Sequence, residues 1–378
     1  MRSTNSLTSI PTPRVVIDRA RVRRNIADMQ ATAARAGVRL RPHAKTHKSP
    51  VIARWQIDAG AVGICCQKLG EAEVFAEAGI GDIRLPYPLQ PSNAARVLAL
   101  MDRAHLSIVV DDPDVARGWS AAIAAAGRRL DVLIKVDVGT HRCGIDPESS
   151  RAVSIIREIA GLSGLHVRGL LSHAGHSYSA RSEEEIEEIA EQEIAILRRL
   201  AADAGRMGVA IDELSVGATP TARFIDRQTG ATEMRPGTYV FYDRTQAGLG
   251  AAPLDRCAMS VIATVVSRPV TARVVFDAGS KTLSSDAVRG FGTVAGYGLV
   301  YPALDAAHPD PSIVIERLSE EHAVARVQQS CALRPGDRVR IIPNHACVVT
   351  NLMDELLVVD DGDEVVDWLP VAARGRIW

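Results

Sequence analysis

A lysine between two histidines lies near the start of the chain, in the stretch RPHAKTHK at 41–48. This stretch follows a short apolar run at 37–40 that is typical of a strand, so Lys45 would stand at the carboxyl end of that strand. In a barrel of alternating strands and helices, this edge carries the chemistry. A lysine that is desolvated there can act as a nucleophile and form a Schiff base. The alternative is a basic phosphate-binding or surface loop.

A second candidate site lies near the C-terminus, where one residue separates His345 from Cys347 after an expected strand at 338–342. Residues i and i+2 of an extended segment project from one face, so the two side chains could bind one metal ion. Nitrogen and sulfur ligands suit zinc, and two protein ligands leave positions open for water or substrate. Because most His-x-Cys pairs bind nothing, a purely structural role is the alternative.

Two loops that follow expected strands carry further polar candidates. Arg142, in the segment 136–144, could direct a fixed cation at a ring nitrogen or a carboxylate. It could equally form a structural ion pair with an aspartate. The segment 172–178 offers His173 and Tyr178 as polar groups facing the site, although a single histidine is more often structural.

Two more loops have the composition of an anion-binding cradle. Gly217, Ala218 and Thr219 follow an expected strand and open a helix, where small residues and free backbone N–H groups favour an anion. Gly237 and Tyr239 follow the next strand. Barrels commonly bind phosphate at the loops of their last two strands, so the pair indicates a phosphorylated ligand. Ordinary tight turns are the alternative.

The elements that would position these residues change in character along the chain. Strand and helix patterns alternate in about eight units, which predicts an α/β fold with a closed parallel (β/α)8 barrel of the TIM type over residues 14–245. Beyond about residue 250, short β runs alternate with Gly, Pro and Asp turns and show no helical period. We therefore expect a C-terminal β domain over 246–378 that carries the metal site, with residues 1–13 packed against it.

Composition limits the possible function classes. The 378 residues carry a net charge of −1, which favours neither nucleic acid nor a membrane surface as a partner. No run approaches the roughly 20 apolar residues of a membrane span, and the N-terminus lacks the apolar core of a signal peptide. The six cysteines include no CxxC pair. We expect a cytoplasmic protein with reduced thiols.

Taken in order, these motifs resemble the fold-type III pyridoxal-phosphate enzymes of the D-threonine aldolase and D-serine dehydratase-like family. The resemblance runs from residues 12–13 to 372–375. It implies an alanine racemase-like barrel joined to a β domain, and a homodimer with its sites at the subunit interface. It also implies that Lys45 holds pyridoxal 5'-phosphate, that Arg142 faces the pyridine nitrogen and that Tyr178 contacts the cofactor. Finally, it implies that the two cradle loops bind the phosphate and that His345 and Cys347 bind a divalent metal, zinc or manganese.

The implied substrates are D-3-hydroxy amino acids, which can react in two ways. If a base, His43 or His173, takes the hydroxyl proton, the Cα–Cβ bond breaks and gives glycine and an aldehyde. If Lys45 takes the α-proton and the metal helps hydroxide leave, the products are a 2-oxo acid and ammonia. The second outcome is that of D-serine or D-threo-3-hydroxyaspartate dehydratases.

The sequence divides between these outcomes. Residues 63–68 and the tail 369–375 resemble the aldolases, whereas Cys347 and residues 215–221 resemble the dehydratases. We favour the aldolase type because its resemblance covers more of the chain. Two other classes remain: a metal-independent amino-acid racemase, which needs a second catalytic base from the β domain, and a non-catalytic pyridoxal-phosphate carrier, which usually lacks such a domain.

Overall fold

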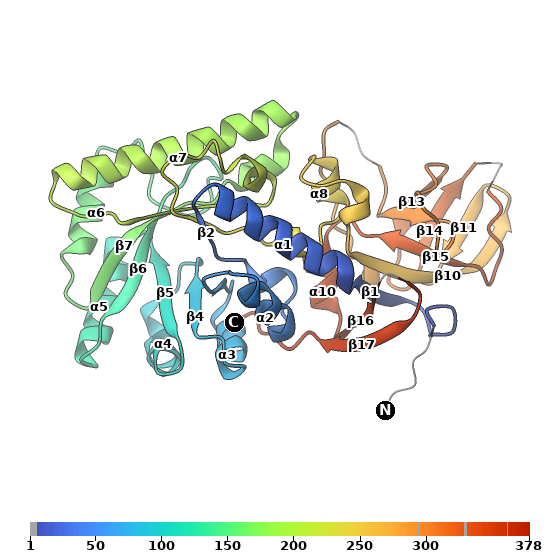
Figure 1. Ribbon diagram of the computed structural model, residues 1–378, viewed down its shortest axis with the longest axis horizontal. Coiled ribbons are helices and arrows are strands. Elements are labelled where there is room, and N and C mark those ends of the chain that lie inside the picture. Colours follow the sequence, from blue (N-terminus) through green and yellow to red (C-terminus); the bar gives the residue numbers. More distant parts are fainter. Residues whose placement is uncertain (1–5, 293–294, 329–330, 361) are drawn as a thin grey trace. The chain divides into compact units, whose positions relative to one another are not determined.

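The computed structural model describes residues 6–292, 295–328, 331–360 and 362–378 (Figure 1). Its contacts divide the chain into two compact units. The barrel unit comprises 28–45, 50–237 and 375–378, and the β unit comprises the described residues up to 27, 46–49 and 238–374. The domain limits 14–245 and 246–378 follow sequence order and stay predictions. Residues 1–5 of the N-terminal segment lie outside the described part of the chain.

Eight parallel strands form the sheet of the barrel unit, and neighbours follow the order β2-β9-β8-β7-β6-β5-β4-β3. The sheet closes on itself because the Leu40 and Pro42 carbonyls accept hydrogen bonds from the Val62 and Cys65 N–H groups, at 3.0 and 2.8 Å. This confirms the predicted closed parallel barrel. The strands are β2 (Arg39–Leu40), β3 (Ile64–Cys65), β4 (Asp82–Leu85), β5 (His105–Val110), β6 (Leu130–Lys135), β7 (Leu165–Leu171), β8 (Glu213–Val216) and β9 (Glu233–Met234).

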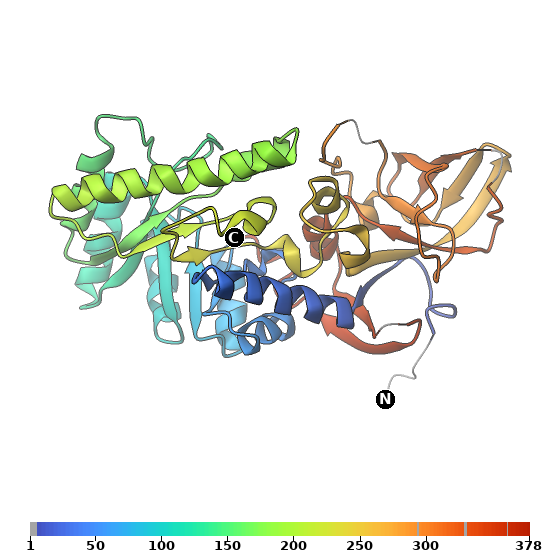
Figure 2. The ribbon, with the colours of Figure 1, turned by 45° about the horizontal axis from the view of Figure 1, so that its top comes forward.

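Helices connect these strands and cover the outer face of the barrel sheet (Figures 1 and 2). Two of them begin at side-chain caps: Asp112 accepts from two N–H groups in the first turn of α5, and Ser182 accepts from one in the first turn of α7. The helices are α2 (Pro50–Asp58), α3 (Leu69–Glu77), α4 (Ala94–Met101), α5 (Pro113–Ala125), α6 (Ala152–Ala160) and α7 (Glu183–Arg206), and α1 (Arg19–Arg35) contributes residues to both units. Short 3-10 turns lie at Ala44–Thr46, Pro91–Asn93, Gly175–Ser179 and Pro220–Phe224.

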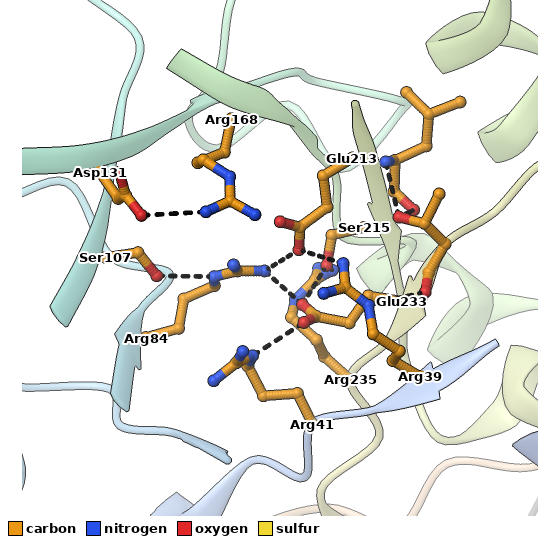
Figure 3. A network of polar contacts seen from close by, with 12 residues as sticks. Arg39, Arg41, Arg84, Ser107, Asp131, Arg168, Glu213, Ser215, Glu233 and Arg235 are labelled. Atoms are coloured by element: carbon orange, nitrogen blue, oxygen red, sulfur yellow. Dashed lines mark hydrogen bonds and ion pairs between the residues drawn. The ribbon is translucent and has the colours of Figure 1, made fainter. Parts of the chain in front are cut away.

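Charged side chains cross the interior of the barrel (Figure 3). Glu233 of β9 accepts from Arg41 Nε at 2.8 Å, from Ser215 Oγ at 2.7 Å and from Arg84 of β4. Arg84 also donates to Glu213 at 2.6 Å. Burial would raise the pKa of Glu233, but the Arg84 and Arg41 charges lower it to about 2. The barrel is therefore held together by ionised groups from strands far apart in the sequence.

The β unit contains a nine-stranded mixed sheet, which confirms the predicted β domain. Its first strand, β1 (Arg14–Asp18), pairs antiparallel with β10 and parallel with β16, so it belongs to this sheet and not to the barrel sheet. Leu7 and Ile10 pack in its core. The other strands are β10 (Met259–Val270), β11 (Arg273–Phe276), β12 (Leu299–Tyr301), β13 (Ile313–Leu318), β14 (Ala323–Val327), β15 (Arg338–Ile342), β16 (Glu355–Val359) and β17 (Val365–Pro370).

The β unit also has helices, two of them beyond residue 250, where the sequence showed no helical period: α9 (Ser280–Leu283) and α10 (Ala346–Leu352). Helix α8 (Arg244–Gly248) precedes that region, and 3-10 turns lie at Thr238–Val240 and Leu254–Arg256. Helix α10 matters most, because it contains Cys347. In the described part of the chain, no helix combines the length and the hydropathy needed to cross a bilayer.

Candidate active site

Lys45 lies in the 3-10 turn Ala44–Thr46, directly after the carboxyl end of β2. The residues before it complete the closure of the barrel, since His43 forms a bridge with Cys65 of β3. The lysine is half-buried. The structure thus places this amine at the barrel edge where the sequence analysis expected it.

Several cations accompany Lys45 at this edge. Lys135, the last residue of β6, is buried, and burial together with the charges of Arg235 and Arg142 lowers its pKa to about 8. Lys135, Arg142 and His173 line one small cavity. Sequence analysis did not single out Lys135 or Arg235. Lys135 could have been recognised as a lysine that ends a largely apolar strand. Arg235 could have been recognised from its position two residues before Gly237 of the predicted cradle.

His173, directly after β7, has a defined tautomer. Its Nδ1 lies 2.8 Å from the Gly217 carbonyl oxygen. A carbonyl can only accept, so Nδ1 carries the hydrogen and Nε2 has the lone pair. Among the described residues, none hydrogen-bonds to Nε2. Burial and the charge of Lys45 hold the pKa of His173 well below its usual value, so the ring is neutral and can accept a proton.

His43 is engaged at both ring nitrogens. Its Nδ1 accepts from the Lys45 backbone N–H at 3.4 Å, and its Nε2 therefore donates to Gln67 Oε1 at 3.1 Å. Burial, followed by the charge of Lys45, lowers the pKa of His43 well below normal. Of the two candidate bases, His173 is the one whose lone pair is available.

The predicted phosphate cradle divides into groups with different roles. Gly217 N–H donates to the buried carboxylate of Glu193 at 3.2 Å, and Gly237 N–H donates to Thr219 Oγ1 at 3.2 Å. Both are therefore satisfied within the protein. The N–H groups of Ala218 and Thr219 have no acceptor among the described residues, and the Thr219 hydroxyl can still donate. A Cβ on Gly217, whose φ is +150°, would lie 2.8 Å from the backbone nitrogen of Arg235, so only glycine fits this turn.

The buried guanidinium of Arg235 lies beneath this cradle with neutral partners. It donates to Ser215 Oγ at 2.6 Å, to the Val216 carbonyl at 2.9 Å and to the Ser172 carbonyl. Burial lowers the pKa of Arg235. The three hydrogen-bond acceptors of Arg235 are neutral, and the charges of the Glu233 and Glu193 carboxylates partly offset the effect of burial. The donors and cations at this edge therefore fit a cofactor phosphate.

The remaining cofactor candidates are placed differently. Arg142 is exposed on the loop after β6, and Tyr178 is half-buried in the turn Gly175–Ser179 after β7. Tyr239 is fully buried, but it belongs to the β unit. The structure gathers Lys45, Arg142 and His173 in the barrel unit, whereas Tyr239 and the two metal candidates lie in the other unit.

The metal candidates His345 and Cys347 adjoin each other at the start of α10. The expectation of one extended segment was wrong: His345 is the N-cap, with extended backbone, and Cys347 already lies in the first helical turn. The buried Asp243 carboxylate starts this helix by accepting from Ala346 N–H at 2.9 Å.

A carboxylate orients the imidazole of His345. Its Nδ1 lies 2.7 Å from Asp286 Oδ2, the kind of carboxylate contact that is usual for metal-binding histidines, so Nε2 is the nitrogen that would bind a metal. Burial opposes protonation, but the hydrogen bond to Cys347, the charges of Cys347 and Asp243, and the hydrogen bond to Asp286 together raise the pKa of His345 to about 10. Within the described ranges, no group of three or more His, Cys, Asp or Glu side chains could enclose a metal. The nitrogen–sulfur pair supplies two ligands of the types that zinc prefers.

Comparison with known proteins covers nearly the whole chain. Residues 17–245 match the family described as alanine racemase, N-terminal domain, and residues 258–359 match the putative serine dehydratase domain. A D-threonine aldolase of Arthrobacter sp. is 35% identical over 377 residues, which covers 98% of this chain and 94% of the relative.

Two solved structures have the same architecture. The D-threonine aldolase from Filomicrobium marinum superposes with a TM-score of 0.88 at 30% identity and covers 100% of both chains. A cysteine-to-alanine mutant of D-threo-3-hydroxyaspartate dehydratase in the metal-free form gives a TM-score of 0.90 at 33% identity, over 97% of this chain and 98% of that one. The relatives include both aldolases and dehydratases. The chain therefore belongs to the pyridoxal-phosphate-dependent lyases of the D-threonine aldolase and D-serine dehydratase family, which are built on the alanine racemase fold.

Proposed function

We propose that this lyase cleaves D-3-hydroxy amino acids to glycine and an aldehyde, as a D-threonine aldolase does. The observation that supports this choice is the fixed tautomer of His173. Retro-aldol cleavage needs a base for the β-hydroxyl that is separate from the amine binding the cofactor. The neutral His173 ring, with Nδ1 fixed by the Gly217 carbonyl and Nε2 available, is such a base in the same unit as Lys45.

The barrel unit would hold the cofactor by its two ends. Bound pyridoxal phosphate supplies an electron sink for the bond that breaks at Cα. Lys45 would carry it covalently, and Arg142 would face its pyridine nitrogen. The N–H groups of Ala218 and Thr219 and the Thr219 hydroxyl would bind the phosphate, while Lys135 and Arg235 supply compensating positive charge.

The β unit would hold a divalent metal through His345 and Cys347. Such a metal, zinc or manganese, supplies a Lewis acid for the substrate's β-hydroxyl. The Asp286 carboxylate holds the imidazole ring at Nδ1, so His345 would offer Nε2 to the ion beside the Cys347 sulfur. His173 would then accept the hydroxyl proton at Nε2 as the Cα–Cβ bond breaks.

Dehydration is the second candidate, and Cys347 favours it. A metal-free structure of a relative, D-threo-3-hydroxyaspartate dehydratase, is that of a cysteine-to-alanine mutant. In this reaction Lys45 would take the α-proton and the hydroxyl would leave as water, so His173 would not be needed as a base.

The products separate the two reactions. Purified protein with pyridoxal phosphate and Mn²⁺ or Zn²⁺ should convert D-threonine into acetaldehyde and glycine, whereas L-threonine should be untouched. Removing the metal with EDTA should stop the reaction, and returning it should restore the activity. Formation of 2-oxobutanoate and ammonia would establish dehydration instead, and the absence of either product from D-threonine and D-serine would reject both candidates.

Replacing His173 with glutamine should lower kcat for aldol cleavage by about 10²–10⁴-fold, the usual contribution of a positioned base. His43→Gln should have a smaller effect, since glutamine can keep the contact with Gln67. In the wild-type protein, the acid limb assigned to His173 should lie below its usual pKa of 6.5, because the neutral form persists to lower pH.

The histidine comparison includes His166→Gln as a control. This residue lies at the amino end of β7, half-exposed, and contacts Asp131 at 2.7 Å. It should keep the wild-type rate. Equal losses for His173→Gln and His166→Gln in acetaldehyde release would show that His173 is not the base.

We propose further that the protein is a cytoplasmic homodimer, as the family resemblance implies. Sedimentation velocity of the holoenzyme measures this directly. A monomeric holoenzyme with full activity would contradict the expectation of a site shared between subunits.

A further inference from the structure

The four residues after Lys45 pack in a different unit from the lysine itself. Lys45 is the last residue of the segment 28–45 of the barrel unit, whereas residues 46–49 belong to the β unit. Two of these residues contact helix α10. The segment 46–49 thus follows the proposed cofactor lysine directly in the sequence and also contacts the helix that contains Cys347.

The first contact is made to the sulfur of Cys347. Cys347 Sγ lies 3.2 Å from Thr46 Oγ1 and 3.6 Å from Thr238 Oγ1. Both threonines are buried, at 0% and 5% exposure. Neither hydroxyl is a ligand of the usual metal-binding types, but both can donate a hydrogen bond.

The second contact fixes the segment one helical turn further along. Lys48 Nζ donates to Asn351 Oδ1 at 2.8 Å, and Asn351 follows Cys347 by four residues, on the same face of α10. The Lys48 carbonyl accepts from Ala373 N–H at 3.0 Å. Lys48 has a φ of 50°, a conformation that a non-glycine residue adopts only when its surroundings enforce it.

We propose that Thr46 is a positioning residue for the metal ligand Cys347, and that the Lys48–Asn351 pair holds Thr46 in place. This inference rests on the proposed metal-dependent function. Cysteine binds a metal as the thiolate, which accepts hydrogen bonds and donates none. The Thr46 hydroxyl would then donate to the sulfur, fix its direction and withdraw charge from it, which leaves the metal a stronger Lewis acid.

Cobalt binding tests this directly, because a thiolate bound to Co²⁺ gives a charge-transfer absorption band. The metal-stripped holoenzyme is titrated with Co²⁺ and compared with Thr46→Val, which loses the hydroxyl, and Thr46→Ser, which keeps it. Thr46→Val should bind Co²⁺ about 10-fold more weakly, the lower end of the usual effect of such outer contacts, and shift the band. Thr46→Ser should restore both properties.

Thr350→Val is the matched control. Thr350 is a buried threonine on the same helix, but its hydroxyl donates to the Ala346 carbonyl at 2.9 Å and not to the sulfur. This variant should keep the affinity and the band. Asn351→Leu tests the second contact and remains informative if Thr46→Val fails to fold; it should weaken Co²⁺ binding in the same direction.

The outcomes separate this inference from the proposed function. If the wild-type protein binds Co²⁺ and either Thr46→Val or Asn351→Leu, when folded, behaves like it, the positioning role is wrong and the proposed function stands. If the wild-type protein binds no metal and its reaction is insensitive to EDTA, the metal-dependent function itself is overturned.

Discussion

Substituting Lys45 with alanine should abolish the covalent attachment of pyridoxal phosphate and lower kcat by at least about 10³-fold. The reason is that Lys45 is the amine that the barrel presents after β2, among the histidines and cations described above. Borohydride reduction of the holoenzyme, followed by peptide mass mapping, measures the attachment. The cofactor mass should lie on the peptide that contains Lys45, and the yellow absorption should be lost in the variant.

A second lysine at the same edge of the barrel, Lys135, could also form the adduct, so the test must distinguish the two. Lys135 ends β6 at the same edge of the barrel, and its lowered pKa of about 8 would also make it nucleophilic. Lys135→Met should still yield the reduced adduct on Lys45. If the adduct instead lies on Lys135, or persists in Lys45→Ala, the roles of the two lysines are reversed.

The sequence was a good guide to strands buried on both faces. The largely apolar runs at 106–110 and 130–137 predict strands, as is typical of parallel strands covered by helices, and the structure has β5 at 105–110 and β6 at 130–135. In the β unit, the strand expected at 338–342 is β15 with the same bounds. In these segments the local pattern and the tertiary environment favour the same structure.

Helix α10 was missed because its sequence opposes its structure. Val348, Val349 and Thr350 are β-branched and have low helix propensity, so residues 346–352 resemble a strand. The helix is started by Asp243, a buried carboxylate about a hundred residues earlier in the chain. A cap supplied from such a distance leaves no local pattern. This is why the spacing of His345 and Cys347 suggested an extended pair.

The choice between His43 and His173 was likewise beyond the sequence. Both residues follow strands, and both are flanked by small or polar residues. They differ in the partner of Nδ1: in His173 this nitrogen faces the Gly217 carbonyl, whereas in His43 it accepts from the Lys45 backbone N–H. For His173 the partner is a loop carbonyl 44 residues away, which only the packing of β7 beside β8 brings within reach.

The charged interior of the barrel leads to the second large prediction. Replacing Glu233 with glutamine should reduce the free energy of unfolding by about 3–5 kcal/mol, the usual cost of breaking a buried ion pair. Glu233 is fully buried and accepts from Arg41 at 2.8 Å and from Arg84. Glutamine has nearly the same shape, so the variant loses the negative charge rather than the packing. The two arginines would remain buried with less compensation.

Acidification gives an independent measure of the same charge. The folded-state pKa of Glu233, about 2, lies below its ordinary value of 4.5. A depressed carboxyl pKa contributes stability that is present above the unfolded-state pKa and is lost as the pH falls through the folded-state value. The difference in stability between wild type and Glu233→Gln should therefore be greatest at neutral pH and shrink as the pH falls below about 4.5. Denaturant unfolding at several pH values measures it.

Glu316→Gln separates a buried ion pair from an exposed one. Glu316 pairs with Arg326 at 2.6 Å, but about half of each side chain is exposed. Because solvent screens such a pair, its loss should cost no more than about 1 kcal/mol. If Glu233→Gln costs as little as Glu316→Gln at neutral pH, the barrel does not depend on its interior charges. A difference between Glu233→Gln and wild type that stays constant with pH would show that the lost stability comes from packing or hydrogen bonding instead of from the ionised carboxylate.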